Sequence, residues 1–204
     1  GTIDKYIGDA QMAFWNAPID DTEHALNAVK TGLEMLKDLD KFNAEITQEG
    51  IPAFGMGLGI NTGNVVVGNM GSDQRFDYTC LGDHVNLAAR LEGQSKNYGV
   101  RIIIGENTAN LVKYKYNIVE LDTVAVKGKS IGVKIFTIAD LDDLASHKKF
   151  LRAYYAGEWR AASLLTTKLK ESNPFLITYY ENMAERMYSV PPINWDGVYK
   201  ATSK

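Results

Sequence analysis

Apolar residues alternate with polar residues or glycine at the start of the chain and recur at helical spacing soon afterwards. Residues 2–15 predict two short strands around Gly8-Asp9, a pair typical of a tight hairpin turn. Over residues 24–50 the apolar positions return every three or four residues, which predicts an amphipathic helix. Residues 54–60 and the β-branched run 65–67 predict a second strand pair around an Asn-Thr-Gly turn.

The rest of the chain alternates strand-like and helix-like segments. A strand over 77–81 precedes a helix from Gly82-Asp83 to Tyr98, and Gly99 stands where a helix-ending glycine belongs. The later segments are predicted as a strand (100–104), a helix (106–112), two strands within 118–138, an aromatic helical region from about 145, and an extended docked tail after Pro191-Pro192. Such alternation indicates an α/β sandwich with a mixed sheet.

Composition narrows the class of protein. The 204 residues are 45% hydrophobic and 23% charged, as in an ordinary globular domain. The net charge of -3 gives no global basic field for nucleic acid or anionic lipid. The single cysteine excludes an internal disulfide framework and fits a reducing compartment. No apolar run has the length of a membrane span, and the start has no signal-peptide pattern.

Two charged side chains flank the predicted hairpin turn. Lys5, Ile7 and Asp9 are spaced by two, so an extended strand would place all three on one face. The Lys5 ammonium could donate to a ring acceptor of a nucleotide, and the Asp9 carboxylate could bind Mg²⁺. A surface turn with two solvated charges explains the same residues and is the simpler interpretation from the residues alone.

The helix predicted after Gly82 carries two polar side chains on one face. Asn86 and Arg90 are four residues apart, whereas Leu87 and Leu91 face elsewhere and supply packing. An amide can orient a hydroxyl group, and a guanidinium suits charge that develops on a phosphorus oxygen. A solvated polar helix face is an equally compatible alternative.

Three further features are weaker signals. Lys127-Gly128-Lys129 links two predicted strands and would suit a polyphosphate tail, although charged hairpin turns are common. The glycine-rich run Gly55-Met-Gly-Leu-Gly lacks the strand–turn–helix context of a phosphate loop, so we interpret it as close backbone packing within a strand. The three histidines show no metal-ligand spacing, and Cys80 has no partner cysteine, so we expect structural roles for them.

Four stretches, taken in order, resemble the class III adenylate and guanylate cyclases. They are residues 1–15 with Lys-Tyr-Ile-Gly-Asp, then Gly59-Ile-Asn-Thr-Gly, then residues 77–92, then Val126-Lys-Gly-Lys. The order of these four stretches is specific to that family, and the resemblance covers about residues 1–140. It implies a class III nucleotide cyclase fold, an α/β (α+β sandwich) unit with a mixed sheet. It also implies a homodimer whose active sites form at the interface.

The resemblance implies a reaction and its metal ions. An adenylate cyclase, a phosphorus–oxygen lyase, converts ATP to 3′,5′-cyclic AMP and pyrophosphate by attack of the ribose 3′-hydroxyl on the α-phosphorus. Two ions, Mg²⁺ or Mn²⁺, bridge two aspartates and the triphosphate in each complete site. Asp9 matches the second of these aspartates.

Five other side chains take roles by the same resemblance. Lys5 matches the lysine that reads adenine, and Thr79 holds the position of its polar partner. Asn86 would orient the ribose, Arg90 would stabilise the pentavalent phosphorus, and Lys127 would hold the terminal phosphates. These roles agree with phosphoryl chemistry, which depends mainly on positioning and charge neutralisation.

The choice of base follows from donors and acceptors. Adenine N1 accepts a hydrogen bond, which Lys5 can donate, whereas guanine N1–H and its amino group need a carboxylate. Guanylate cyclases usually have Glu in place of Lys5 and Cys in place of Thr79. Cys80 comes one residue late and would face the other way on a strand. The pattern therefore favours ATP.

The family's first metal-binding aspartate lies on a strand well ahead of the Lys-Tyr-Ile-Gly-Asp hairpin, whereas this chain starts at Gly1. We therefore expect residues 1–142 to be a catalytic domain that lacks its first strand and helix. Residues 143–204 resemble the helical C-terminal extension of bacterial cyclases. With one metal-binding carboxylate in place of two, we do not expect this piece alone to form the complete metal site or to be active.

A catalytically degenerate cyclase-like domain that only dimerises or senses nucleotide is the alternative function. The joint presence of Lys5, Asp9, Asn86, Arg90 and Lys127 argues against it. The Gly-Gly-Asp/Glu-Glu-Phe hairpin of diguanylate cyclases and a P-loop are both absent from the sequence. We expect ATP and a second copy as partners, no nucleic acid, and a cytoplasmic location. A membrane would be reached only through upstream segments, as in a membrane-anchored sensor.

Overall fold

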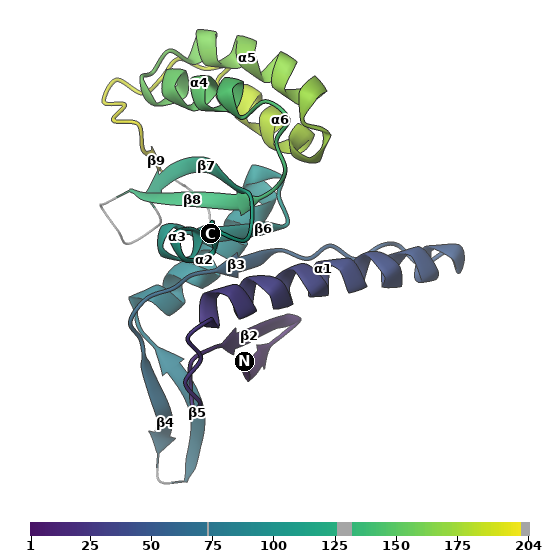
Figure 1. Ribbon diagram of the computed structural model, residues 1–204, viewed down its shortest axis with the longest axis vertical. Coiled ribbons are helices and arrows are strands. Elements are labelled where there is room, and N and C mark those ends of the chain that lie inside the picture. The colour runs from purple at the N-terminus through teal and green to yellow at the C-terminus, as the bar shows by residue number, and fades with distance from the viewer. Residues whose placement is uncertain (73, 126–131, 201–204) are drawn as a thin grey trace.

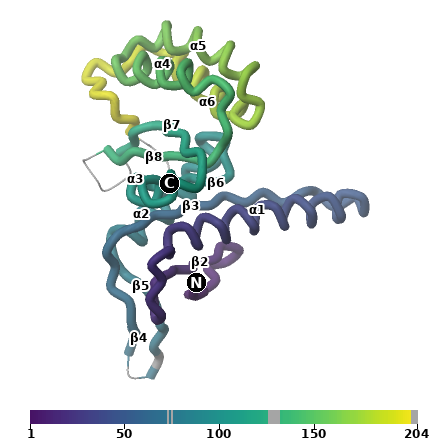
Figure 2. Tube along the Cα trace, in the orientation of Figure 1, coloured from purple at the N-terminus to yellow at the C-terminus, as the bar shows by residue number. Residues whose placement is uncertain are grey.

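The computed structural model describes residues 1–72, 74–125 and 132–200 (Figure 1). In this part of the chain a five-stranded mixed sheet lies between a layer of C-terminal helices and the long helix α1 (Figure 1). The other strands of the described residues form two separate hairpins, β1–β2 and β4–β5. The chain path in Figure 2 shows β4–β5 standing away from the central sheet.

The first hairpin forms where the sequence predicts it. Strands β1 (Thr2–Ile7) and β2 (Ala10–Phe14) pair antiparallel across a two-residue turn, with Gly8 at a φ of 65°. Positive φ favours glycine, which explains why this turn can be so tight. The register shifts between Ile3 and Lys5, because Ile3 faces Ala13 and Lys5 faces the next residue, Met12. Asp4 is therefore the extra residue of a β-bulge.

Helix α1 (His24–Gln48) confirms the predicted amphipathic helix. Its first turn is fixed by Asp21, whose Oδ1 accepts the backbone N–H of Glu23 at 3.0 Å and an amide hydrogen of Asn27 at 3.1 Å. The apolar side of α1 buries Val29 and Leu36 in a cluster that also contains strand residues of the central sheet. Burial of this side, more than local propensity, stabilises so long a helix.

The central sheet has the order β3-β6-β8-β7-β9. Its strands are β3 (Leu58–Ile60), β6 (Ile102–Gly105), β7 (Ile118–Ala125), β8 (Val133–Ile138) and β9 (Tyr199–Lys200). The outer pairs β3–β6 and β7–β9 are parallel, and β6–β8 and β7–β8 are antiparallel. The predicted mixed sheet is thus confirmed, and β9 confirms the docked tail. Helix α3 (Glu106–Val112) follows β6 directly.

One predicted strand pair is wrong. Residues 54–60 and 65–67 do not pair with each other, because β3 joins β6 while β4 (Val66–Ser72) pairs with β5 (Arg75–Leu81). The reason is tertiary packing. Helix α2 (Asp83–Tyr98) lies so close to β3 that a Cβ on Gly59 would collide with the backbone at Ala88 and Glu92. Glycine therefore lets β3 sit beneath α2 in the central sheet.

The C-terminal helices pack on the same chain. They are α4 (Leu144–Tyr155), α5 (Trp159–Ser172), the 3₁₀ turn η1 (Pro174–Leu176) and α6 (Ile177–Arg186). Their buried aromatic residues share one core with Leu121 and Ile135 of the sheet, and they cover β7 in Figure 1. None of the helices in the described ranges combines the length and apolar character that a membrane span needs.

Candidate active site

Lys5 and Thr79 lie close to one buried carboxylate. The Thr79 hydroxyl donates to Asp4 Oδ2 at 2.5 Å, and Lys5 Nζ lies 3.3 Å from Asp4 Oδ1. Asp77 Oδ2 is 4.0 Å from the same ammonium. The Asp4 side chain is 0% exposed, whereas those of Lys5 and Asp77 are 37% and 59% exposed. We call these four residues, Asp4, Lys5, Asp77 and Thr79, the Asp4 cluster.

The bulge in β1 explains how two consecutive side chains share this cluster. In a regular strand Asp4 and Lys5 would point to opposite faces, but the extra residue of a bulge re-aims the side chains beside it. Asp77 and Thr79 are two apart on the regular strand β5, so they share a face. Thr79 faces Asp4 from that strand, and Cys80, which is also buried, follows on the other face. The sequence analysis did not identify Asp4, because regular alternation of side chains along a strand would place Asp4 on the face opposite Lys5.

Within the described residues no hydrogen bond or ion pair joins Asp9 to this cluster. Asp9 occupies the exposed turn after β1, which ends at Ile7, so the alternation that predicted a shared face with Lys5 does not reach it. A divalent ion needs several oxygen ligands, of which Asp9 supplies one carboxylate. Within the described residues no group of three or more His, Cys, Asp or Glu side chains is placed to hold a metal ion. The described residues therefore do not form a complete metal site.

Asn86 and Arg90 project from the side of α2 that its own domain does not cover. Successive helix side chains turn by about 100°, which puts Asn86 and Arg90 nearly opposite Ala88, Glu92 and Ser95. The backbone at Ala88 and Glu92 and the side chain of Ser95 crowd the glycines before and within β3. Leu87 and Leu91 are buried, as predicted, and Asn86 is exposed. In the described part of the chain neither Asn86 nor Arg90 makes a side-chain hydrogen bond or ion pair.

The start of α2 is fixed by the loop after β3. Asn61 Nδ2 donates to the His84 carbonyl oxygen at 3.1 Å and lies 3.2 Å from His84 Nδ1. A side chain on Gly63 would collide with the His84 ring. This loop therefore holds the first turn of α2, just before Asn86. The stretch Gly59-Ile-Asn-Thr-Gly thus has a positioning role.

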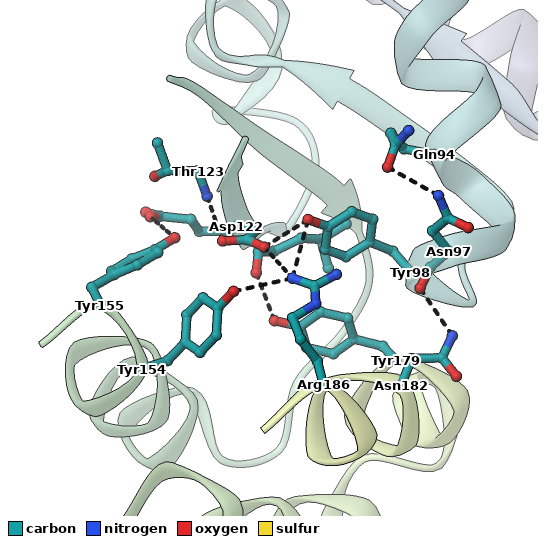
Figure 3. A network of polar contacts seen from close by, with 12 residues as sticks. Gln94, Asn97, Tyr98, Asp122, Thr123, Tyr154, Tyr155, Tyr179, Asn182 and Arg186 are labelled. Carbon is teal, nitrogen blue, oxygen red and sulfur yellow. Dashed lines mark hydrogen bonds and ion pairs between the residues drawn. The ribbon is translucent and has the colours of Figure 1, made fainter. Parts of the chain in front are cut away.

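The other end of α2 is held by a buried polar network that no sequence pattern predicts (Figure 3). Tyr98, the last residue of α2, donates its hydroxyl to Asp122 Oδ2 at 2.6 Å, and Arg186 Nη1 donates to the same oxygen at 2.7 Å. Arg186 also donates to the Tyr154 hydroxyl at 3.1 Å. Burial and the Asp122 carboxylate raise the pKa of Tyr98 well above its ordinary value, so Tyr98 remains a donor. The network joins α2, β7, α4 and α6.

Four of the six predicted site residues fall into two groups, and Asp9 stands by itself in the exposed turn after β1. Lys5 and Thr79 belong to the Asp4 cluster, and Asn86 and Arg90 belong to α2. No hydrogen bond or ion pair among the described residues joins the two groups. Lys127 lies outside the described residues.

Comparison with known proteins identifies the kind of domain. The family model described as "Adenylate and Guanylate cyclase catalytic domain" matches residues 4–140. Adenylate cyclase 1 of Rhizobium meliloti (strain 1021) is 38% identical over 138 residues, which is 68% of this chain and 21% of that protein. An adenylate cyclase of Anabaena cylindrica is 39% identical over 145 residues, which is 68% of this chain and 28% of that protein. The chain therefore spans only a minor part of these relatives.

Solved structures give the same fold. The adenylyl cyclase CyaB from P. aeruginosa aligns with a TM-score of 0.62 at 36% identity, covering 69% of this chain and 72% of that one. The guanylyl cyclase Cya2 aligns with a TM-score of 0.62 at 35% identity, covering 71% of this chain and 72% of that one. Because both kinds of cyclase fit equally well, the backbone does not decide between adenine and guanine.

Proposed function

Since the chain belongs to the family of adenylate and guanylate cyclase catalytic domains, we propose that it converts ATP to 3′,5′-cyclic AMP and pyrophosphate as one half of a homodimer. The observation that supports this most is the placement of Asn86 and Arg90 on the uncovered side of α2. Two side chains suited to phosphoryl transfer are thus presented outward, away from the domain that carries them.

A homodimer would bring together the two groups of site residues that no contact joins within one chain. Most homodimers have twofold symmetry. If one surface of the first chain contacts a different surface of the second chain, the symmetry therefore creates the same contact a second time with the roles of the chains exchanged. We propose that α2 of one protomer faces the Asp4 cluster of its partner. Each of the two sites would then contain Lys5 and Thr79 from one chain and Asn86 and Arg90 from the other. The family relationship supports this arrangement.

The chemistry of each site can be assigned to the side chains. The ribose 3′-oxygen forms a bond to the α-phosphorus, the bond from that phosphorus to the bridging oxygen of pyrophosphate breaks, and the 3′-hydroxyl proton leaves to solvent. Asn86 would fix the ribose in line for this attack, and Arg90 would donate to the phosphorus oxygens as charge develops on them. Lys127 is proposed to hold the terminal phosphates.

Asp9 is proposed as one ligand for Mg²⁺ or Mn²⁺. Such an ion would neutralise charge on the triphosphate when it is bound. The described residues do not complete its site, so every step above is assigned to the chain's own side chains.

The choice of ATP rests on side chains. A lysine and a threonine at the two base-reading positions fit adenine better than guanine, as the donors and acceptors of the bases require. We also propose that the catalytic domain comprises residues 1–142, that residues 143–204 form a helical extension, and that the protein works in the cytoplasm.

A cyclase assay on the full-length protein tests the proposed function. ATP and GTP are supplied separately with Mn²⁺, and cyclic nucleotides are separated and quantified. We expect cyclic AMP from ATP. Asn86→Ala or Arg90→Ala should lower kcat on the order of a hundredfold with little change in KM. Lys96→Ala, an exposed change later on the same helix, is the matched control and should leave both constants unchanged.

Two results would contradict this proposal. An equal loss of kcat and of ATP affinity in the Asn86 and Arg90 variants would remove their roles in the transition state. No cyclic nucleotide from the wild-type protein with either substrate would favour a domain that only dimerises or senses nucleotide.

A further inference from the structure

We propose that Asp4 is a specificity-determining residue: it fixes the Thr79 hydroxyl as an acceptor and the Lys5 ammonium as a donor toward the base, which selects adenine. This inference rests on the proposed function and adds a residue to it. Asp4 is a positioning residue, because its fully buried carboxylate touches Lys5 and Thr79 and reaches the base only through them.

The first half of the argument concerns the hydroxyl hydrogen of Thr79. A hydroxyl has one hydrogen to donate and lone pairs that accept. The carboxylate of Asp4 can only accept, so at 2.5 Å from Asp4 Oδ2 the Thr79 hydrogen is committed to Asp4. The Thr79 oxygen then presents only lone pairs to a base. A lone pair accepts from the exocyclic amino group of adenine, and it repels the carbonyl oxygen at the same place in guanine.

The second half concerns the Lys5 ammonium. Asp4 Oδ1 lies 3.3 Å from Lys5 Nζ but is a buried oxygen without a hydrogen bond, and Asp77 Oδ2 is 4.0 Å from the same ammonium. Within the described residues the ammonium is thus held by charge while its N–H groups make no hydrogen bond. These donors suit adenine N1, which accepts, and oppose guanine N1–H, which donates. One carboxylate thereby sets both halves of an adenine-specific pattern.

The Asp4→Asn variant tests this role of Asp4 directly, because it preserves the shape of the side chain and replaces one acceptor oxygen with an NH₂ donor. The new amide would turn its oxygen toward the Lys5 ammonium and its NH₂ toward Thr79, since an NH₂ group beside an ammonium is repelled. The Thr79 hydroxyl would then accept from Asn and point its own hydrogen at the base. That arrangement opposes the adenine amino group and suits the guanine carbonyl.

The measurement is kcat/KM in the full-length protein for ATP, GTP and purine riboside 5′-triphosphate, which lacks the amino group. For Asp4→Asn we expect the ATP-to-GTP ratio to fall on the order of tenfold to a hundredfold, with the preference for ATP over the amino-free analogue lost. Asp77→Asn removes the same charge beside the same lysine but does not touch Thr79. In this control the preference for ATP over the amino-free analogue should persist.

A double variant separates this role from general damage. In a Thr79→Val background the effect of Asp4→Asn on ATP against the amino-free analogue should disappear, because no hydroxyl remains to reorient. Thr79→Ser should retain the wild-type preference. An active Asp4→Asn protein with unchanged ratios, or an effect that persists in Thr79→Val, would overturn the inference while leaving the cyclase function intact. Absence of activity in the wild type would instead contradict the proposed function.

Discussion

At the residue scale, one buried carboxylate influences three neighbouring side chains. Asp4 accepts from Thr79, lies beside Lys5, and acts on the thiol of Cys80 on the next position of β5. Burial of the thiol, and then the negative charge of Asp4, raise the pKa of Cys80 above its ordinary value. The thiol therefore reports on the charge of Asp4 without any substrate.

The reactivity of Cys80 gives a prediction. A raised pKa means that the reactive thiolate appears only at higher pH, and removal of the Asp4 charge lowers that pKa toward its ordinary value. Asp4→Asn should therefore be alkylated by iodoacetamide several-fold faster than wild type at about pH 8. Cys80 is the only cysteine in the sequence, so mass spectrometry gives the rate directly. Asp77→Asn is the control, and equal rates in all three proteins would contradict a charged Asp4 beside the thiol.

The sequence predicted the residue types of the candidate site but not all of its members. Lys5, Asn86 and Arg90 were identifiable because spacing and family resemblance both mark them. Asp4 was not, since a bulge re-aims it and no local pattern marks a bulge. Arg186 and Asp122 were not identifiable either, because they are 64 residues apart and meet only in the folded chain.

At the element scale, α2 is held at both ends, and Asn86 and Arg90 project from the part between them. The loop after β3 binds the first turn, where Asn61 donates to the His84 carbonyl oxygen. The buried network of Tyr98, Asp122, Tyr154 and Arg186, which we call the Asp122 network, holds the last turn through Tyr98. Helices α4 and α6, which carry Tyr154 and Arg186, are therefore part of what positions Asn86 and Arg90. The Arg186 guanidinium also lies over the Tyr199 ring at 3.6 Å, which links the tail strand β9 to the same anchor.

The Asp122 network should contribute strongly to stability. Arg186→Met leaves a fully buried carboxylate without its cationic partner, which typically costs about 3–5 kcal/mol. Arg152→Met, an exposed change on α4, should cost little. Urea denaturation followed by tryptophan fluorescence measures both, since Trp159 of α5 and Trp195 lie in the C-terminal region with ring centroids 5.2 Å apart. Equal stability of the two variants would show that Arg186 does not anchor α6 to the central sheet.

The helices and strands themselves were predicted more accurately than the pairing of the strands. The first hairpin, α1, α2 with its terminal Gly99, and the docked tail all form where the hydrophobic pattern places them. The pairing of residues 54–60 with 65–67 was wrong, because the packing of α2 on Gly59 decides where β3 lies. Periodicity reports which face of a segment is buried, whereas strand order depends on contacts between distant segments.

At the scale of the whole molecule, the proposed site is divided between two surfaces. The Asp4 cluster lies where β1 meets β5, and the pair Asn86 and Arg90 lies on α2. A chain altered in one surface still carries the other intact. Two differently altered chains should therefore complement each other if the sites are shared between protomers.

Mixing two inactive variants tests this central claim most directly. Full-length Lys5→Ala and Arg90→Ala proteins are assayed for cyclic AMP alone and after mixing under conditions that allow subunit exchange. A mixed dimer contains one site with both residues intact, so an equal mixture should recover about a quarter of the wild-type activity. Mixing Arg90→Ala with Asn86→Ala, whose changes lie on the same surface, should recover none. Failure of the Lys5 and Arg90 pair to recover activity, although subunits exchange, would contradict a site shared between two chains.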